Sequence, residues 1–124
     1  PEMARVISSA KTPFNVNGAA QIAAIAALKD QAWMLASIQS IRMQRARISA
    51  ELSAMSFNVA PSQTNFLFFD TGQDSAKVAE TLLKDGIIVK AWREAPYETW
   101  LRVTIGTPTE IDRFLASMRK QLTT

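Results

Sequence analysis

The chain has 124 residues, of which 48% are apolar and 20% charged, a balance that suits one compact domain and excludes a disordered chain. Cys and His are both absent, which excludes disulfides, thiolate or imidazole metal sites and a Ser-His-Asp triad, and is compatible with the reducing cytoplasm, where we expect the protein. The net charge of +3 favours anionic ligands without indicating nucleic acid, and no secretion signal or apolar run of the ~20 residues that cross a bilayer is present, so no membrane partner is expected.

The first half of the chain predicts helices. Residues 1–10 form a short helix that ends before Pro13. The region 18–55 lacks Pro and predicts a long helical segment with a break at Asp30, which caps the second helix. Apolar residues of that second helix recur at helical spacing and form one stripe, interrupted by Arg45, through Met34, Ile38, Ile41, Ile48, Leu52 and Met55.

From residue 57 onward the pattern changes to short strands. We expect strands at 57–59, 65–70, 87–90 and 101–105. The strand at 65–70 is expected to be buried on both faces, because its apolar residues do not alternate with polar ones.

Two helices are expected among these strands. Asp74 caps the first of them, and Gly86 suits the position just after its end. Thr107 and Glu110 predict a capping box for the last helix, whose apolar face holds Ile111, Phe114, Leu115, Met118 and Leu122. The expected fold class is α+β, with long N-terminal helices followed by a β-β-α-β-β-α unit.

Two cations on the expected strands are candidate binding residues. Lys90 ends the third strand, and Arg102 lies in the fourth. If these strands are neighbours, the two cations converge at one rim, where a carboxylate or phosphate can bind between them. Spacing alone leaves open two solvated cations, or Arg102 paired with an acid. Trp92, in the loop after Lys90, is either a ligand contact or a packing residue. Acidic residues do not cluster at metal-ligand spacing, so no metal is expected.

Five motifs occur in order along the chain, and their order and spacing extend over essentially all of it. They are Pro13-Phe14-Asn15-Val16-Asn17, Pro61-Ser62-Gln63-Thr64-Asn65-Phe66-Leu67, Gly86-Ile87-Ile88-Val89-Lys90, Leu101-Arg102-Val103-Thr104-Ile105-Gly106-Thr107 and Asp112-Arg113-Phe114-Leu115. This ordered set resembles the C-terminal part of histidinol-phosphate aminotransferase and its relatives, the fold type I pyridoxal-phosphate enzymes. The resemblance implies that residues 1–55 are the end of a large domain and the interdomain helices, and that 56–124 are the C-terminal small α+β domain.

The resemblance also implies roles for single residues. Arg102 corresponds to the Arg that binds the substrate's anionic group, and Lys90 stands where a second substrate-binding Arg is common. The resemblance implies that Trp92 lines the entrance of the same substrate-binding site. The Lys that holds pyridoxal 5'-phosphate, with the other main cofactor residues, precedes this chain, since Lys11 and Lys29 lie in the wrong contexts.

The implied parent enzyme is a cytoplasmic homodimer of histidine biosynthesis. It transfers an amino group between an amino acid or histidinol phosphate and a 2-oxo acid, and the chain alone, without the large domain, is expected to be inactive. A chain that opens Pro1-Glu2-Met3 is read either as a processed start or as a piece of a longer protein.

Alternatives stay open at this point. Within the superfamily they are an aromatic or other amino-acid aminotransferase and a threonine-phosphate decarboxylase. From another class they are a stand-alone α+β binding module and a dimerisation module that uses the apolar helix stripe. RNA-binding sheets display aromatic residues on an open face, whereas the strand at 65–70 is expected to bury both faces.

Overall fold

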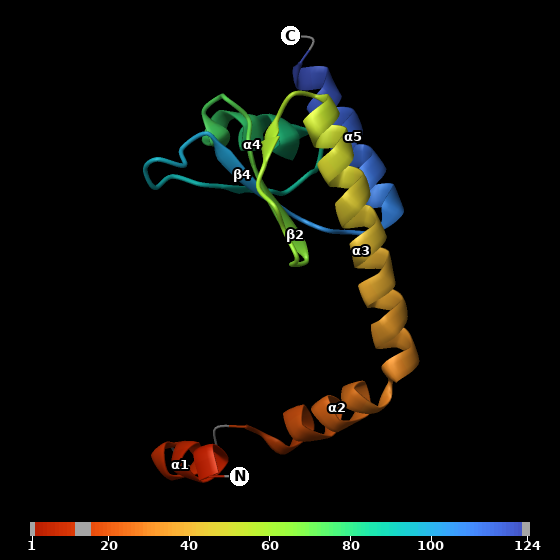
Figure 1. The fold of residues 1–124 in the computed structure, drawn as a ribbon, viewed down its shortest axis with the longest axis vertical. Helices are drawn as coiled ribbons and strands as arrows, with labels where there is room; N and C mark the ends of the chain where they lie inside the picture. The colour runs from red at the N-terminus through yellow and green to blue at the C-terminus, as the bar shows by residue number, and fades with distance from the viewer. Residues whose placement is uncertain (1, 12–15, 123–124) are drawn as a thin grey trace. The chain divides into compact units, whose positions relative to one another are not determined.

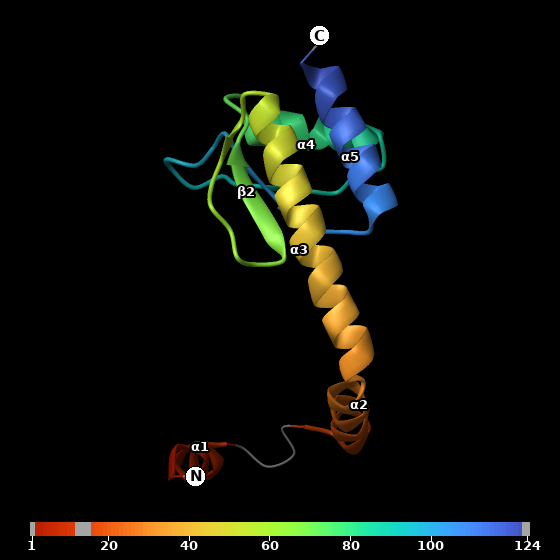
Figure 2. The same ribbon diagram turned by 45° about the vertical axis from the view of Figure 1, so that its right-hand side comes forward.

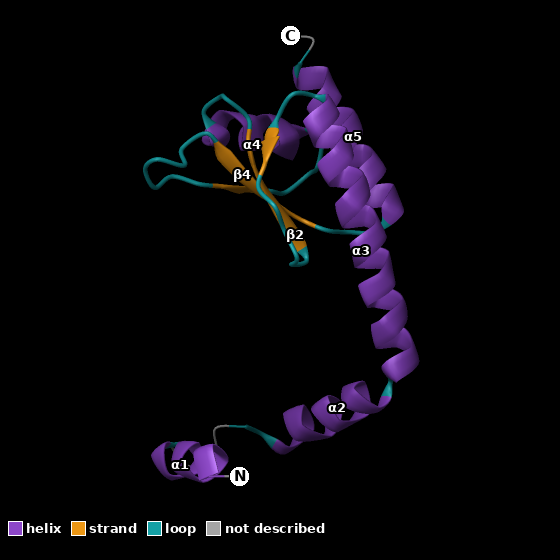
Figure 3. Cartoon of the chain, in the orientation of Figure 1, coloured by secondary structure: helices purple, strands orange, loops and turns teal. Residues whose placement is uncertain are grey.

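The structure is a computed structural model that describes residues 2–11 and 16–122. Its helices and strands are drawn in Figures 1 and 3. The chain divides into two compact units, Pro1–Ala36 and Ser37–Thr124. The division expected from the sequence, between residues 55 and 56, refers to the domains of a longer protein and stays a prediction. Residues 12–15, which hold the first part of the motif Pro13-Phe14-Asn15-Val16-Asn17, lie outside the described residues.

The first unit contains α1 (Glu2–Ala10), α2 (Gly18–Lys29) and the start of α3 (Gln31–Ala54). The side chain of Asn17 caps α2 by accepting a hydrogen bond from the backbone N–H of Ala20 at 2.8 Å. Asp30 ends α2, and its Oδ1 accepts from the backbone N–H of Trp33 at 3.2 Å. The predicted break and cap at Asp30 are therefore confirmed. All side chains of α1 and α2 are exposed.

The second unit contains the rest of α3 and a sheet of four antiparallel strands. The strands are β1 (Asn58–Val59), β2 (Phe66–Asp70), β3 (Lys90–Ala91) and β4 (Trp100–Thr104), in the spatial order β1-β2-β4-β3. Helix α4 (Ser75–Lys84) lies between β2 and β3 in sequence, and α5 (Pro108–Gln121) follows β4. The mixed α+β class is confirmed.

The third strand is shorter than the stretch 87–90 predicts, and at its start the backbone of Ile87 closes the end of α4 instead. Gly86, at φ 75°, and Ile87 donate hydrogen bonds to the carbonyl oxygens of Leu83 and Leu82 at 2.9 and 3.0 Å. This pair of bonds is a Schellman motif, for which Gly is favoured because a positive φ costs it little. The position predicted for Gly86 is confirmed, and only Lys90 and Ala91 remain to pair with β4.

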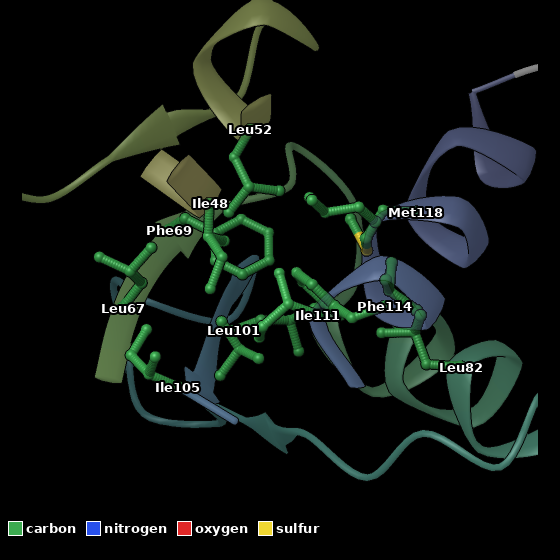
Figure 4. Packing of buried hydrophobic residues seen from close by; sticks show 13 residues of the cluster. Ile48, Leu52, Leu67, Phe69, Leu82, Leu101, Ile105, Ile111, Phe114 and Met118 are labelled. Atoms are coloured by element: carbon green, nitrogen blue, oxygen red, sulfur yellow. The ribbon is translucent and has the colours of Figure 1, made fainter. Parts of the chain in front are cut away.

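Helices cover one face of the sheet and build the core there (Figure 4). In β2 the buried residues are Leu67 and Phe69, whereas Phe66 and Phe68 are half-buried. The expectation that both faces of this strand are buried is therefore wrong. The reason is that α3, α4 and α5 supply all their core residues to the side of Leu67 and Phe69. Those helical core residues are Ile48, Leu52, Val78, Leu82, Ile111, Phe114, Leu115 and Met118.

The apolar stripe of α3 is the reason that this helix belongs to the core. Ile48 and Leu52 are fully buried, and Ile41 and Met55 pack against the same cluster. Arg45 interrupts the stripe and donates hydrogen bonds to the carbonyl oxygen of Thr64 at 2.7 Å and to the Gln63 side chain. It therefore ties α3 to the segment that leads into β2.

The helix caps form as the sequence predicts. Asp74 accepts from the backbone N–H groups of Ala76 and Lys77, and Thr107 and Glu110 form the full capping box. Leu122 is the exception: it lies just beyond the end of α5 and is 49% exposed, so its expected place on the buried face is wrong.

Helices α3 and α5 lie side by side within the second unit (Figures 1 and 2). Ion pairs join Arg47 to Asp112 and Arg119 to Glu51 between these helices. No described helix is both long and apolar enough to cross a membrane.

Candidate functional site

The face of the sheet opposite the core brings the two predicted cations together. In the antiparallel register, Arg102 of β4 is the direct partner of Phe68 on one side and of Lys90 on the other. Residues that face each other on neighbouring strands project to the same side of a sheet. Phe68, Arg102 and Lys90 therefore form one row across three strands, and the predicted neighbourhood of Lys90 and Arg102 is confirmed.

Neither cation of this row is neutralised by an acid. Within residues 2–11 and 16–122, ion pairs join other residues, and no carboxylate lies within ion-pair distance of Arg102 or Lys90. Each cation lies over an aromatic ring instead. The Cζ of Arg102 is 5.2 Å from the ring centroid of Phe66, and the Nζ of Lys90 is 5.6 Å from that of Trp92. Both distances are within the range of a cation–π interaction.

Trp92 is part of an aromatic cluster with Phe68, Tyr97 and Trp100. The Phe68 ring lies at the centre, with its centroid 4.7 Å from that of Trp100, 5.3 Å from Trp92 and 5.7 Å from Tyr97. Such offset and edge-on ring pairs are favourable beyond the area they bury. Trp92 thus packs against protein rings and flanks Lys90 at the same time. The packing role is present in the structure, and the role as a ligand contact stays a prediction.

The backbone fixes Trp92 in this place. Its N–H donates to the carbonyl oxygen of Trp100 at 3.0 Å, and its own carbonyl oxygen accepts from the Oγ of Ser75 at 2.8 Å. Ser75 is buried in the first turn of α4, and its N–H binds the carbonyl oxygen of Glu98. Both ends of the segment between β3 and β4 are therefore held to the scaffold.

A shallow hollow of about 200 Å³ lies beside the cations and is lined by Ile88, Val89, Lys90, Arg102 and Thr104. A larger hollow of about 370 Å³ lies near Gly106 and Phe114 and contains neither cation. We assign the site to the smaller hollow, because charge and free donors, rather than volume, decide where a small anion binds. The guanidinium of Arg102 can there bind a carboxylate or phosphate bidentately, with Lys90 as a second positive charge.

The sequence indicated Arg102, Lys90 and Trp92 but missed Phe66, Phe68, Tyr97 and Trp100. The alternation of side chains along β2 and β4 could have indicated most of these rings. It places on one face Phe66, Phe68, Trp100 and Arg102. The place of Tyr97 depends on the path of the loop.

Neither a buried lysine nor a cluster of metal-ligating side chains occurs among the described residues. Every lysine of the chain is exposed, whereas a lysine that holds such a cofactor needs a desolvated pocket to lower its pKa. Within the described part of the chain, no group of three acidic, His or Cys residues is placed to hold a metal ion.

Fold and site together define an α+β domain with two cations that lack an acidic partner among the residues that the structure describes and are flanked by aromatic rings on the open face of the sheet. Residues 1–118 match the family model of aminotransferase class I and II. The chain belongs to this family, as the resemblance described above implies.

Relatives in the family are histidinol-phosphate aminotransferases. The chain is 40% identical over 122 residues to histidinol-phosphate aminotransferase 1 of Mesorhizobium japonicum, covering 98% of this chain and 33% of that protein. It is 42% identical over 111 residues to histidinol-phosphate aminotransferase 3 of Rhizobium meliloti, covering 90% and 30%. The chain therefore spans about a third of the length of the curated relatives that it matches.

Solved structures agree with this assignment. A putative aminotransferase from Burkholderia pseudomallei matches with a TM-score of 0.88 at 25% identity, over 98% of this chain and 37% of that one. The histidinol-phosphate aminotransferase of Sinorhizobium meliloti, solved in complex with pyridoxal-5'-phosphate, matches with a TM-score of 0.83 at 26% identity, over 99% and 34%.

Proposed function

We propose that this chain is the substrate-binding C-terminal part of a pyridoxal-phosphate aminotransferase of the histidinol-phosphate type. The observation that carries the proposal is the unpaired Arg102, which lies on the open sheet face beside Lys90 in a chain of the class I and II aminotransferase family. An arginine kept free of acids, on the face not used for the core, is available for an anionic substrate.

Each site residue has a separate role in this proposal. Arg102 binds the phosphate or carboxylate of the substrate through its planar fork. Lys90 adds a second charge without the fork, and so attracts the anion without fixing its orientation. Trp92 flanks Lys90, whose Nζ lies 5.6 Å from the centroid of the Trp92 ring.

The cofactor acts elsewhere in the whole enzyme. Pyridoxal phosphate, when bound there, carries the amino group between donor and acceptor. Because the exposed lysines of this chain do not suit the cofactor, residues outside the chain hold it in this proposal. The chain's own contribution is to bind and orient the substrate anion, and to exclude water as its domain closes on the large domain. We further propose that the enzyme is a cytoplasmic homodimer, and that the 124 residues alone catalyse no transfer.

Replacing Arg102 in the whole enzyme tests the proposal. Arg102→Ala is expected to lower kcat/KM for histidinol phosphate by about 10- to 100-fold, the range for loss of hydrogen bonds between charged groups. Cofactor occupancy, measured from its absorbance, should stay at the wild-type level. Arg102→Lys keeps the charge without the planar fork. Its kcat/KM should lie between those of the wild type and Arg102→Ala. Equal losses of occupancy and efficiency would show that Arg102 is structural.

The substrate within the superfamily is settled by a donor screen. Histidinol phosphate, aromatic amino acids and threonine phosphate are offered to the same enzyme, and release of carbon dioxide from threonine phosphate would identify a decarboxylase. A preference for an aromatic amino acid over histidinol phosphate would replace the proposed substrate while keeping the reaction class.

The open face also supports a second candidate function from another class. RNA-binding sheets carry aromatic rings and cations on an open face, as Phe66, Phe68 and Arg102 do here. The family match over residues 1–118 places this candidate below the aminotransferase. A salt-dependent mobility shift of single-stranded RNA by the 124-residue chain, lost in Phe68→Ala, would favour it.

A further inference from the structure

The guanidinium of Arg102 does not lie over the ring that directly faces it across the strands. Phe68 is the direct partner of Arg102, whereas Phe66 is its diagonal neighbour on β2. A diagonal neighbour lies farther away across the strands, but long side chains reach it. The guanidinium lies over Phe66, with 5.2 Å between Cζ and the ring centroid.

The aromatic cluster explains this choice. The ring of Phe68 is in contact with Trp92, Tyr97 and Trp100, which occupy the space around it. The Arg102 side chain is therefore turned toward the other end of β2, where Phe66 is in contact with none of these rings among the contacts of the described residues.

A ring and an acid hold an arginine in different ways. A carboxylate neutralises the guanidinium and occupies its N–H donors, so it competes with an incoming anion. An aromatic ring attracts the flat face of the cation, while the five N–H donors at its edge stay free. Asp70, which shares this face of β2, is engaged elsewhere, because its Oδ1 accepts from the backbone N–H of Gly72 at 2.9 Å.

We infer that Phe66 is a positioning residue: its ring holds the Arg102 guanidinium in place with its donors free for the substrate anion. The inference rests on the proposed function of Arg102. The ring acts by reducing the number of conformations that the Arg102 side chain loses on binding. Lys90 over Trp92 repeats the arrangement on the neighbouring strand.

The expected effect is small and specific. Cation–π contacts at partly exposed sites correspond to a change of about two- to fivefold in a binding constant. In the whole enzyme, Phe66→Leu removes the ring but keeps an apolar side chain. It should raise KM for histidinol phosphate by about two- to fivefold and leave kcat within twofold. Phe66→Tyr keeps the ring and should restore the wild-type KM.

A double-mutant cycle with Arg102→Ala separates positioning from packing. If Phe66 acts through Arg102, then Phe66→Leu causes no further rise in KM when Arg102 is already Ala. Cofactor absorbance in all variants reports whether they fold. Phe66→Leu could raise KM equally in the wild type and in Arg102→Ala, or leave KM unchanged in the wild type. Either result would overturn the inference and leave the role of Arg102 intact. A wild-type KM in Arg102→Ala itself would instead overturn the proposed function, and the inference with it.

Discussion

Lys90 and Arg102 face each other directly across β3 and β4, two positive side chains in one register pair. Like charges at such positions destabilise an antiparallel pair, and no acid lies within ion-pair distance of either among the described residues. The fold therefore carries an electrostatic cost at this point, which a bound anion would relieve.

Neutralising Lys90 should stabilise the fold and weaken the site. We expect Lys90→Gln to raise the free energy of unfolding of the 124-residue chain by about 0.2 to 1 kcal/mol, toward the low end because Lys90 is exposed. The gain should shrink in high salt, which screens exposed charges. In the whole enzyme the same substitution should raise KM for the phosphate substrate. Urea unfolding at low and high salt measures the first effect.

Lys11→Gln is the matched control for this prediction, since Lys11 is exposed and lies outside the sheet. It removes the same charge without relieving the opposed pair. An equal gain in both variants would show that net charge, rather than the pair, sets the stability.

Phe68 and Phe69 are neighbours in β2 with opposite roles, and their truncation should have different costs. Phe69 is fully buried and its ring faces Phe57 and Phe114. Phe69→Ala is expected to cost about 3 to 5 kcal/mol, enough to abolish cooperative unfolding of a small domain. Phe68→Ala removes a half-buried ring and should leave a folded chain of lower stability. Circular dichroism during thermal unfolding compares the two; an equal loss would contradict the one-sided core.

Acid should weaken the start of α5 through Glu110. Hydrogen bonds from the N–H of Thr107 at 2.7 Å and from its Oγ1 at 2.8 Å lower the pKa of Glu110 below its ordinary value. The unfolded chain then binds the proton at a higher pH than the folded chain does. This contribution to stability is complete above the ordinary pKa of Glu110 and is lost as the pH falls through the lowered pKa of the folded chain.

Glu110→Gln should make unfolding less sensitive to acid, as measured by urea midpoints at several pH values. Some sensitivity should remain, because a hydrogen bond from Ser117 and the charge of Lys120 also lower the pKa of Asp85. Glu80→Gln, on the exposed side of α4, should keep the wild-type pH profile. An unchanged profile in Glu110→Gln would count against the capping box as its source.

The 124-residue chain by itself should self-associate. Large apolar side chains of the first unit are exposed, among them Met3, Val6, Ile7, Ile22, Ile25, Leu28 and Trp33. Exposed apolar side chains in such number on short helices favour association with another apolar surface. Sedimentation velocity should show species above 13.7 kDa that grow with concentration. A clean monomer would count against the proposal that the chain is one part of a larger enzyme.

Local sequence rules predicted the features that depend on a few neighbouring residues. The caps at Asp30, Asp74 and Thr107 form as expected because each involves side chain and backbone within three residues. The approach of Lys90 to Arg102 also followed from the sequence, once the two strands were taken as neighbours.

Features that depend on tertiary packing were beyond these rules. The two faces of β2 have similar residues, so composition alone did not show which face the helices would cover. Strand β3 starts late because the backbone N–H of Ile87 donates to the carbonyl oxygen of Leu82 at the end of α4 and not to a neighbouring strand. The contact of Phe66 with Arg102 depends on the ring of Trp92, which packs against Phe68 and lies more than twenty residues after Phe66 in sequence.

Both edge strands of the sheet, β1 and β3, contain two residues each. A long bare edge is a template on which a second chain can add by backbone hydrogen bonding, and very short edge strands with a lysine give it little to pair with. Copies that associate through exposed helices should therefore form amorphous or small assemblies rather than amyloid-like fibrils. The charge of Lys90 on β3 disfavours the addition of a second chain at this edge. Lys90→Val would remove that charge and should make strand addition more favourable.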